Sequence, residues 1–72
     1  LKKRKPLTIK QQQEFLIESL PGVGPQISKR LLKKFSTIKN LVNANEEELT
    51  QVEKIGKIKA KQIKKVLEEK YE

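Results

Sequence analysis

Hydrophobic residues recur at helical spacing in five short stretches of this chain, and no useful length alternates hydrophobic with polar residues as a β-strand does. The stretches predict helices from about residue 9 to 19, 25 to 35, 36 to 42, 46 to 52 and 57 to 71. The sequence therefore predicts an all-α fold of five short helices, in which two helix-hairpin-helix units are joined by a connector helix. Because neither proline nor glycine follows Gly56, we expect the last helix to be the longest.

Polar residues mark where several of these helices begin. Thr8 is a suitable N-cap, and Gln11 three residues later completes the reciprocal pattern of a capping box. Asn45 and Glu48 repeat this pattern before the fourth helix. We expect Gly24 to cap the second helix, with the proline that follows it at the first helical position. The acidic cluster around Glu48 is thus predicted to serve the helix start, and not metal binding or catalysis.

The helices that follow the two glycine turns each have one hydrophobic face. In the second helix, the residues expected to point inward are Ile27, Ser28, Leu31, Leu32 and Phe35. In the last helix, they are Ile58, Ala60, Ile63, Val66 and Leu67. Lysines occupy much of the remaining surface, so we expect these helices to pack through the hydrophobic stripes and to leave cationic faces in solvent.

The first helix is hydrophobic on more than one side. Phe15 and Ile17 lie about 200° apart on a helical wheel, so one small core cannot easily cover both. A chain this short buries only about 60% of its unfolded surface, and such domains often gain stability from a second copy. We therefore predict a homodimer with an interface formed by Phe15, Ile17, Leu67 and Tyr71. The alternative is that Phe15 and Leu67 fill the core of the monomer.

The segment from Leu20 to Pro25 recurs in weaker form 32 residues later. Gly24 aligns with Gly56, and a hydrophobic residue precedes each of them. A glycine-rich turn that leads into a helix leaves backbone N–H groups without partners, and these groups together with the helix dipole attract an anion such as phosphate. The repeat thus predicts two phosphate-binding hairpins. The second is the weaker one, because Lys54 replaces its first glycine.

The chain carries 17 Lys and Arg residues against 9 Asp and Glu residues, which gives a formal net charge of +8. Charge alone fits either a soluble lysine-rich surface or a polyanionic partner. Because the two hairpins also provide places for phosphate, the combination favours DNA. The absence of Cys and His excludes disulfides and thiolate metal sites, and it removes the commonest general base. We therefore expect no metal, no cofactor and no catalytic site for this chain. No hydrophobic run approaches the roughly 20 residues that a membrane helix needs, so we also expect no membrane partner.

The repeat also aligns the lysines that we expect to contact DNA. Lys29 and Lys33 match Lys61 and Lys65, and each pair lies one turn apart on the outer face of the helix after its hairpin. We predict that one hairpin grips each DNA strand across the minor groove, through phosphates and without reading sequence. The three aromatic residues are too few for a typical single-strand binder. The predicted DNA-binding residues are Gly22, Val23, Gly24, Gln26, Lys29, Arg30, Lys33, Lys54, Ile55, Gly56, Lys57, Lys59, Lys61 and Lys65.

The run from Gln13 to Pro25, QEFLIESLPGVGP, resembles the C-terminal tandem helix-hairpin-helix domain of the XPF/Hef family. Glu46-Glu47-Glu48-Leu49, together with Ile55-Gly56 and Ala60, is similar to the second half of that domain. The resemblance covers about residues 8 to 71. It implies a noncatalytic DNA-binding and dimerisation module of an endonuclease that acts on branched or forked DNA. In archaeal Hef members the same protein also carries a helicase domain.

Two other functions remain open from the sequence. The hairpin motif is shared with the C-terminal domain of UvrC, so an excision-repair module is one alternative. A protein-interaction module that dimerises and hardly binds DNA is the other, and the intact Gly22 and Gly24 argue against it. Residues 1–7 are basic without periodicity and are predicted to be a linker from an upstream domain, whereas residues 8–72 form the DNA-binding domain. We expect such a protein to be intracellular and associated with DNA.

Overall fold

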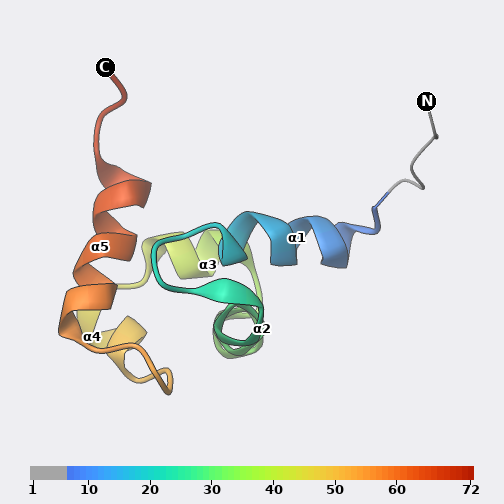
Figure 1. Cartoon of the computed structure of the whole chain (residues 1–72), viewed down its shortest axis with the longest axis horizontal. Helices are drawn as coiled ribbons and strands as arrows, with labels where there is room; N and C mark the ends of the chain where they lie inside the picture. Colours follow the sequence, from blue (N-terminus) through green and yellow to red (C-terminus); the bar gives the residue numbers. More distant parts are fainter. Residues whose placement is uncertain (1–6) are drawn as a thin grey trace.

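The computed structural model describes residues 7–72, and the regular structure in this range is entirely helical. The helices are α1 (Ile9–Glu18), α2 (Gly24–Phe35), α3 (Ile38–Asn43), α4 (Glu46–Thr50) and α5 (Lys57–Glu68). The predicted all-α fold and the order of its five helices are confirmed (Figure 1). The predicted basic linker lies outside the described residues except for Leu7, which is exposed.

Two helix-hairpin-helix units are joined by the connector α3. In the first unit α1 packs on α2, in the second α4 packs on α5, and α3 packs on α2. Figure 1 shows α2 almost end-on below α1, whereas α5 rises at one side of the molecule with α4 at its lower end. Each unit therefore keeps its own helix pair, and the connector sets one unit beside the other.

Both predicted capping boxes are present. Thr8 Oγ1 accepts a hydrogen bond from the backbone N–H of Gln11 at 3.1 Å, and Gln11 Oε1 accepts one from the N–H of Thr8 at 3.0 Å. At α4, Asn45 Oδ1 accepts from the N–H of Glu48 at 2.8 Å, and Glu48 Oε1 accepts from the N–H of Asn45 at 3.1 Å. Each box satisfies two backbone donors that would otherwise have no partner within the protein.

Two other helix starts differ from their predicted positions, by one residue for α2 and by two residues for α3. α2 begins at Gly24 with Val23 as its N-cap, so the prediction that Gly24 is the cap is wrong by one residue. α3 is capped by Thr37, whose Oγ1 accepts a hydrogen bond from the N–H of Asn40 at 3.0 Å. Ser36, which was predicted to start this helix, instead ends α2 with a φ of 68°. A left-handed residue turns the chain and cannot begin the next helix.

One hydrophobic core is shared by both units and the connector. Its buried members are Ile17, Leu20, Val23, Leu31, Leu41, Ala44, Leu49, Val52, Ile55, Ala60 and Ile63. Ser28 is also fully buried, and its Oγ donates a hydrogen bond to the carbonyl oxygen of Pro25 at 2.8 Å, so the hydroxyl keeps a partner. Ser28 and Ala60 occupy equivalent places in the repeat, which puts a small side chain where the second helix of each unit enters the core.

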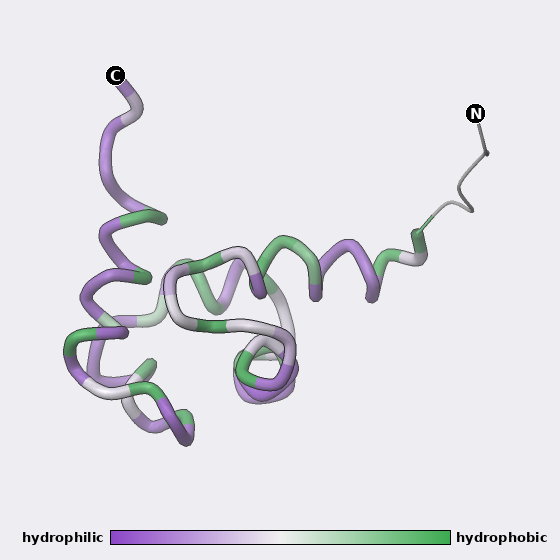
Figure 2. The backbone as a smooth tube through the Cα atoms, viewed as in Figure 1, coloured by the Kyte–Doolittle hydropathy of each residue, from purple (hydrophilic) through white to green (hydrophobic). Residues whose placement is uncertain are grey.

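The buried face of α5 is narrower than predicted. Ala60 and Ile63 are fully buried and Leu67 packs against the core, but Ile58 and Val66 are 78% and 56% exposed. Ile58 lies about 200° around the helix from Ala60, on the opposite face, and Val66 lies at the edge of the buried stripe. Figure 2 shows α5 as mostly hydrophilic, with separate hydrophobic positions. α5 has 12 residues, as α2 does, so the prediction that it is the longest helix is wrong.

Candidate nucleic-acid interface

The first hairpin is a tight turn between α1 and α2. The N–H of Leu20 donates to the carbonyl of Ile17, and the N–H of Val23 donates to the carbonyl of Leu20, both at 3.1 Å. Gly22 and Gly24 have φ values of 68° and 67°, a left-handed conformation that glycine adopts without steric cost. The two glycines therefore allow the chain to turn sharply between α1 and α2.

The second hairpin repeats these hydrogen bonds at positions 32 residues later. The N–H of Val52 donates to the carbonyl of Leu49, and the N–H of Ile55 donates to the carbonyl of Val52, again at 3.1 Å. Lys54 takes the place of Gly22 and keeps the left-handed conformation, with a φ of 75°. The turn is thus retained even though a residue with a β-carbon is strained in this conformation.

The two hairpins differ at their final glycine. Gly24 has a φ of 67°, whereas Gly56 has a φ of −91° and extended backbone. Each of these glycines stands where a helix begins, and a β-carbon added to either would meet no atom within 4 Å beyond the adjoining residues of the chain. The space in front of both backbones is therefore open. Close approach of a phosphate to the N–H groups of the next helical turn requires such an opening.

Val23 and Ile55 anchor the hairpins in the core. Both were predicted to bind DNA, but their side chains are only 4% exposed. A buried hydrophobic side chain cannot reach a ligand, and the backbone N–H groups of Val23 and Ile55 already donate hydrogen bonds within their hairpins. Their burial fixes each turn against the body of the domain, which holds the neighbouring backbone N–H groups in place.

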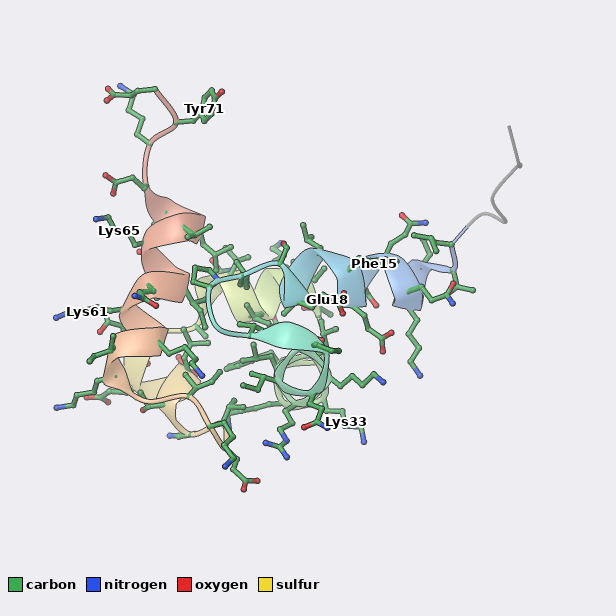
Figure 3. All side chains as sticks on the ribbon, viewed as in Figure 1. Phe15, Glu18, Lys33, Lys61, Lys65 and Tyr71 are labelled. Carbon is green, nitrogen blue, oxygen red and sulfur yellow. The ribbon has the colours of Figure 1, made fainter. Side chains whose placement is uncertain are left out.

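Most of the other predicted DNA-binding residues have exposed side chains on the hairpins or on the helices that follow them. They are Gln26, Lys29 and Lys33 in the first unit and Lys54, Lys57, Lys61 and Lys65 in the second. Figure 3 shows Lys61 and Lys65 projecting from α5 on the side away from α2, whereas Lys33 projects below α2. The cationic side chains of the two units therefore flank the domain and do not converge on one point.

Lys29, Arg30 and Lys33 of α2 border a groove of about 780 Å³ between α1 and α2. The α1 side of this groove is polar, with Gln11 and Gln13 among its residues. Arg30 is half-buried, and its Nη1 lies 3.8 Å from Oε2 of Glu53 in the second hairpin. The side chains of Arg30 and Glu53 are 40% and 73% exposed, so this ion pair is weak and leaves the guanidinium able to turn toward a phosphate.

Lys59 was predicted to contact DNA, but it makes a contact within the domain. It is half-buried on α5, and its Nζ donates a hydrogen bond to the carbonyl oxygen of Lys54 at 3.2 Å. Its aliphatic stem lies beside Gly22 of the first hairpin. Helical periodicity places Lys59 on α5, but it does not show which other segments lie within reach of that side chain.

Lys64 on α5 has a structural role that the sequence pattern did not predict. Its Nζ donates a hydrogen bond to the carbonyl oxygen of Val42 at 3.0 Å and lies 3.0 Å from Oε2 of Glu68. Its side chain is only 12% exposed, so it ties α5 to the connector and offers little charge to a ligand. The sequence did contain one signal for this burial. Lys64 lies four residues after Ala60, and residues at this spacing share one helix face.

The four residues predicted for a dimer interface do not share one surface. Phe15 is 56% and Tyr71 is 99% exposed, whereas Leu67 is half-buried against the core (Figure 3). Ile17 is 1% exposed and belongs to the core, so its assignment to an interface is wrong. α1 turns Ile17 inward and leaves Phe15 in solvent, so Phe15 does not fill the monomer core either. Leu16, which is 57% exposed, extends the hydrophobic surface around Phe15.

Residues 7–72 contain no group of three or more His, Cys, Asp or Glu residues placed to hold a metal ion. Glu48, within the acidic cluster at the start of α4, is engaged in the capping box. Among the same residues, no helix has the length and hydrophobicity to cross a membrane. The exposed lysines and the two open helix starts are therefore the chemical features to which a function can be assigned.

A family model described as a SAM-like helix-hairpin-helix tandem matches residues 14–69. The structure of XPF from Aeropyrum pernix superposes with a TM-score of 0.87 at 30% sequence identity, and the match covers 100% of this chain and 34% of that chain. A structure of that protein in complex with DNA superposes with a TM-score of 0.85 at 31% identity, over 90% of this chain and 32% of that chain. The resemblance to XPF that the sequence predicted is confirmed.

Relatives in sequence are much longer than this chain. A Methanocaldococcus jannaschii protein named "Putative ATP-dependent RNA helicase" is 50% identical over 66 residues, which are 92% of this chain and 8% of the relative. The 3′-flap repair endonuclease Xpf of Saccharolobus solfataricus is 42% identical over 59 residues, or 82% of this chain and 25% of the relative. UvrABC system protein C of Carboxydothermus hydrogenoformans is 45% identical over 53 residues, which are 74% of this chain and 9% of the relative.

Proposed function

We propose that this chain is the DNA-binding and dimerisation module of a structure-specific endonuclease. The premise is its family, since the chain belongs to the SAM-like helix-hairpin-helix tandem family. It binds forked, flapped or junction DNA through phosphates and does not read sequence. The observation that carries this proposal is the duplicated hairpin, in which the same backbone hydrogen bonds recur 32 residues apart on a chain of formal charge +8. The similarity to a DNA complex of XPF supports the same partner.

Each hairpin binds phosphate through the backbone N–H groups at the start of the helix that follows it. α2 and α5 direct the positive ends of their dipoles at the hairpins, and the nearby lysines add charge. Backbone N–H groups carry no information about base identity, so the contacts fix position without sequence preference. Selection of a DNA shape then depends on how the two hairpins are placed relative to each other.

Catalysis belongs to other domains of the parent protein. The similarity to a 3′-flap repair endonuclease and to a protein named as a helicase supports a repair nuclease that also carries a helicase domain. The acidic cluster of this chain lies in the first turn of α4, where negative charge favours the helix dipole. The module therefore delivers the parent nuclease to branched DNA and keeps it associated with DNA.

DNA binding is expected to weaken steeply as salt is added. If the hairpins and lysines neutralise about four to eight phosphates, the slope of log affinity against log salt concentration is about −4 to −7. Fluorescence anisotropy with labelled duplexes of different sequence, and with a fork built from the same strands, measures both slope and preference. We expect equal affinities for the sequences and tighter binding of the fork. An affinity that does not change with salt would contradict binding through phosphates. A chain that binds no DNA would favour a module that only binds protein.

Two double variants of equal charge identify the lysines that contact phosphate. Lys29→Ala combined with Lys33→Ala removes two proposed contacts and is expected to reduce the magnitude of the salt slope by about 2. Lys39→Ala combined with Lys70→Ala removes the same charge from exposed positions outside the proposed interface, and the slope should change much less. Equal reductions would show that net charge carries the binding.

We further propose that the module forms a twofold-symmetric homodimer through the outer face of α1. Phe15 and Leu16 leave hydrophobic surface in solvent, and closed twofold pairing is the commonest way to cover such a surface. Sedimentation at micromolar concentration is therefore expected to show a wild-type dimer, and Phe15→Asp to give the 8.4 kDa monomer. Ile58→Asp places the same acid on an exposed residue of α5 and should leave the dimer intact. A monomeric wild-type chain would exclude this part of the proposal.

A second function, an excision-repair module of the UvrC type, is favoured by the match to UvrABC system protein C. Such a module would use the same hairpins and phosphates, so the isolated chain does not distinguish the two parents. The sequence encoded before this segment distinguishes them. An acidic metal-nuclease motif of the XPF type there would establish the first function, and a different nuclease domain would favour the second.

A further inference from the structure

Lys59 touches both hairpins. A β-carbon placed on Gly22 would lie 2.9 Å from Cε of Lys59, 3.3 Å from Cδ and 3.4 Å from Cγ, so the lysine stem runs directly beside the backbone of the first hairpin. At the end of that stem, Nζ donates a hydrogen bond to the carbonyl oxygen of Lys54 in the second hairpin at 3.2 Å. One side chain of α5 therefore joins the first hairpin by packing and the second by a hydrogen bond.

The two contacts fall at equivalent positions of the repeat. Gly22 and Lys54 are 32 residues apart, and both are left-handed, with φ values of 68° and 75°. Gly22 thus has a second reason to lack a side chain, because a β-carbon at 2.9 Å from Cε would force Lys59 aside. Lys54 can carry a side chain, because Lys59 contacts Lys54 through its carbonyl oxygen and not at the position of a β-carbon.

The first unit does not provide a matching link. The residue equivalent to Lys59 is Ile27, which is hydrophobic and packs against the core. The repeat therefore changes from a core-packing residue to a cation at a place where the two hairpins meet. A lysine suits this place because its methylene stem can lie along backbone while its ammonium reaches a polar partner.

We propose that Lys59 is a positioning residue that holds the two hairpins at a fixed separation, so that both engage one DNA at the same time. This inference rests on the proposed function, because it concerns how the two hairpins share a DNA. Two binding points on one rigid body bind more tightly than the same points on parts that move separately, since the second contact forms at a high effective concentration. Val23 and Ile55 anchor the base of each turn in the shared core, and the Lys59 link sets the spacing of the exposed backbone of the two turns, so loss of the link weakens their joint binding.

Lys59→Met tests the link because it keeps an unbranched stem beside Gly22 and removes the ammonium. Lys61→Met removes one exposed charge from the same helix and is the charge-matched control. We expect Lys59→Met to weaken duplex binding about tenfold, at least about threefold more than Lys61→Met. Its salt slope should also fall by more than the roughly 0.9 expected for one phosphate contact. Equal losses of affinity and slope in the two variants would overturn the proposal.

Gly22→Ala and Gly24→Ala provide a second comparison. Both place alanine at nearly the same left-handed φ, 68° and 67°, but only a β-carbon at position 22 meets Lys59. In the Gly22→Ala background the link is already displaced, so adding Lys59→Met should cost no more than adding Lys61→Met. In the Gly24→Ala background, the full loss of about tenfold should return. The same additional loss in both backgrounds would overturn the proposal.

Circular dichroism and thermal unfolding establish that each variant is folded before its binding is measured. If Gly22→Ala does not fold, the comparison of Lys59→Met with Lys61→Met decides alone. A wild-type chain that binds no DNA would overturn the proposed function and this inference with it. Wild-type binding, together with equal losses in the two lysine variants, would overturn only the role of Lys59.

Discussion

Ile17→Asp is expected to unfold this domain. Ile17 is 1% exposed and belongs to the core. Loss of such a side chain costs about 2–5 kcal/mol, and an aspartate without a partner in the core adds a further penalty. A domain of this length has a total stability of roughly 4–11 kcal/mol by the usual range per residue. Circular dichroism at neutral pH should therefore show that most of the helical signal is lost.

Leu16→Asp is the matched control, one residue earlier in α1. The side chain of Leu16 is 57% exposed, so an aspartate there remains in water, and the free energy of unfolding should fall by less than about 1 kcal/mol. Thermal unfolding compares the two variants directly. A folded Ile17→Asp chain with the melting temperature of the wild type would contradict the burial of Ile17.

The sequence predicted that α1 is hydrophobic on more than one side, but it did not predict which side faces the core. Ile17 and Leu20 are buried, whereas Phe15 and Leu16 are exposed. Helical periodicity relates residues within one helix, and the face that becomes buried depends on α2, which packs against it. Because this packing cannot be read from one helix alone, the sequence wrongly assigned Ile17 to a dimer interface.

The 32-residue repeat predicted more than the helical periodicity did. It aligned two turns, and the structure gives both turns the same backbone hydrogen bonds. It did not predict that Gly24 and Gly56 differ in φ, because glycine adopts either conformation and its presence fixes neither. The left-handed φ of Lys54 was also missed, and its alignment with Gly22 was the signal that could have revealed it.

Two lysines of α5 show why charge alone does not identify a DNA contact. Lys59 and Lys64 both donate hydrogen bonds to backbone carbonyl oxygens of other segments, in the second hairpin and at the end of α3. A lysine stem is long enough to bring the ammonium to such a partner from a position beside the core. The sequence gives the number of cations, whereas only the packing of α5 shows which of them are already engaged.

Gly24→Val is expected to weaken DNA binding about hundredfold. The glycine has a φ of 67°, which a β-branched residue adopts only with strain, so the backbone that leads into α2 should shift. The side chain would also fill the open space in front of the helix start. A hydrogen bond to a charged group contributes about 1.5–3 kcal/mol, and each 1.4 kcal/mol is about tenfold in affinity, so losing one or two phosphate contacts gives this effect.

Gly56→Val makes the same change at the equivalent position of the second hairpin. Here the φ is −91°, and a β-carbon added to Gly56 would meet no atom within 4 Å beyond the adjoining residues of the chain. Valine therefore fits without strain, and its effect measures bulk at the phosphate alone. We expect Gly56→Val to lower DNA affinity about tenfold. Lys54→Ala removes one exposed charge and keeps the hairpin backbone, so we expect it to lower DNA affinity only about threefold. Thermal unfolding must first show that Gly24→Val is folded, because strain of about 1–2 kcal/mol lowers its stability. Equal losses from folded Gly24→Val and Lys54→Ala chains would mean that charge carries the binding, since only Gly24 shapes the N–H groups at the start of α2.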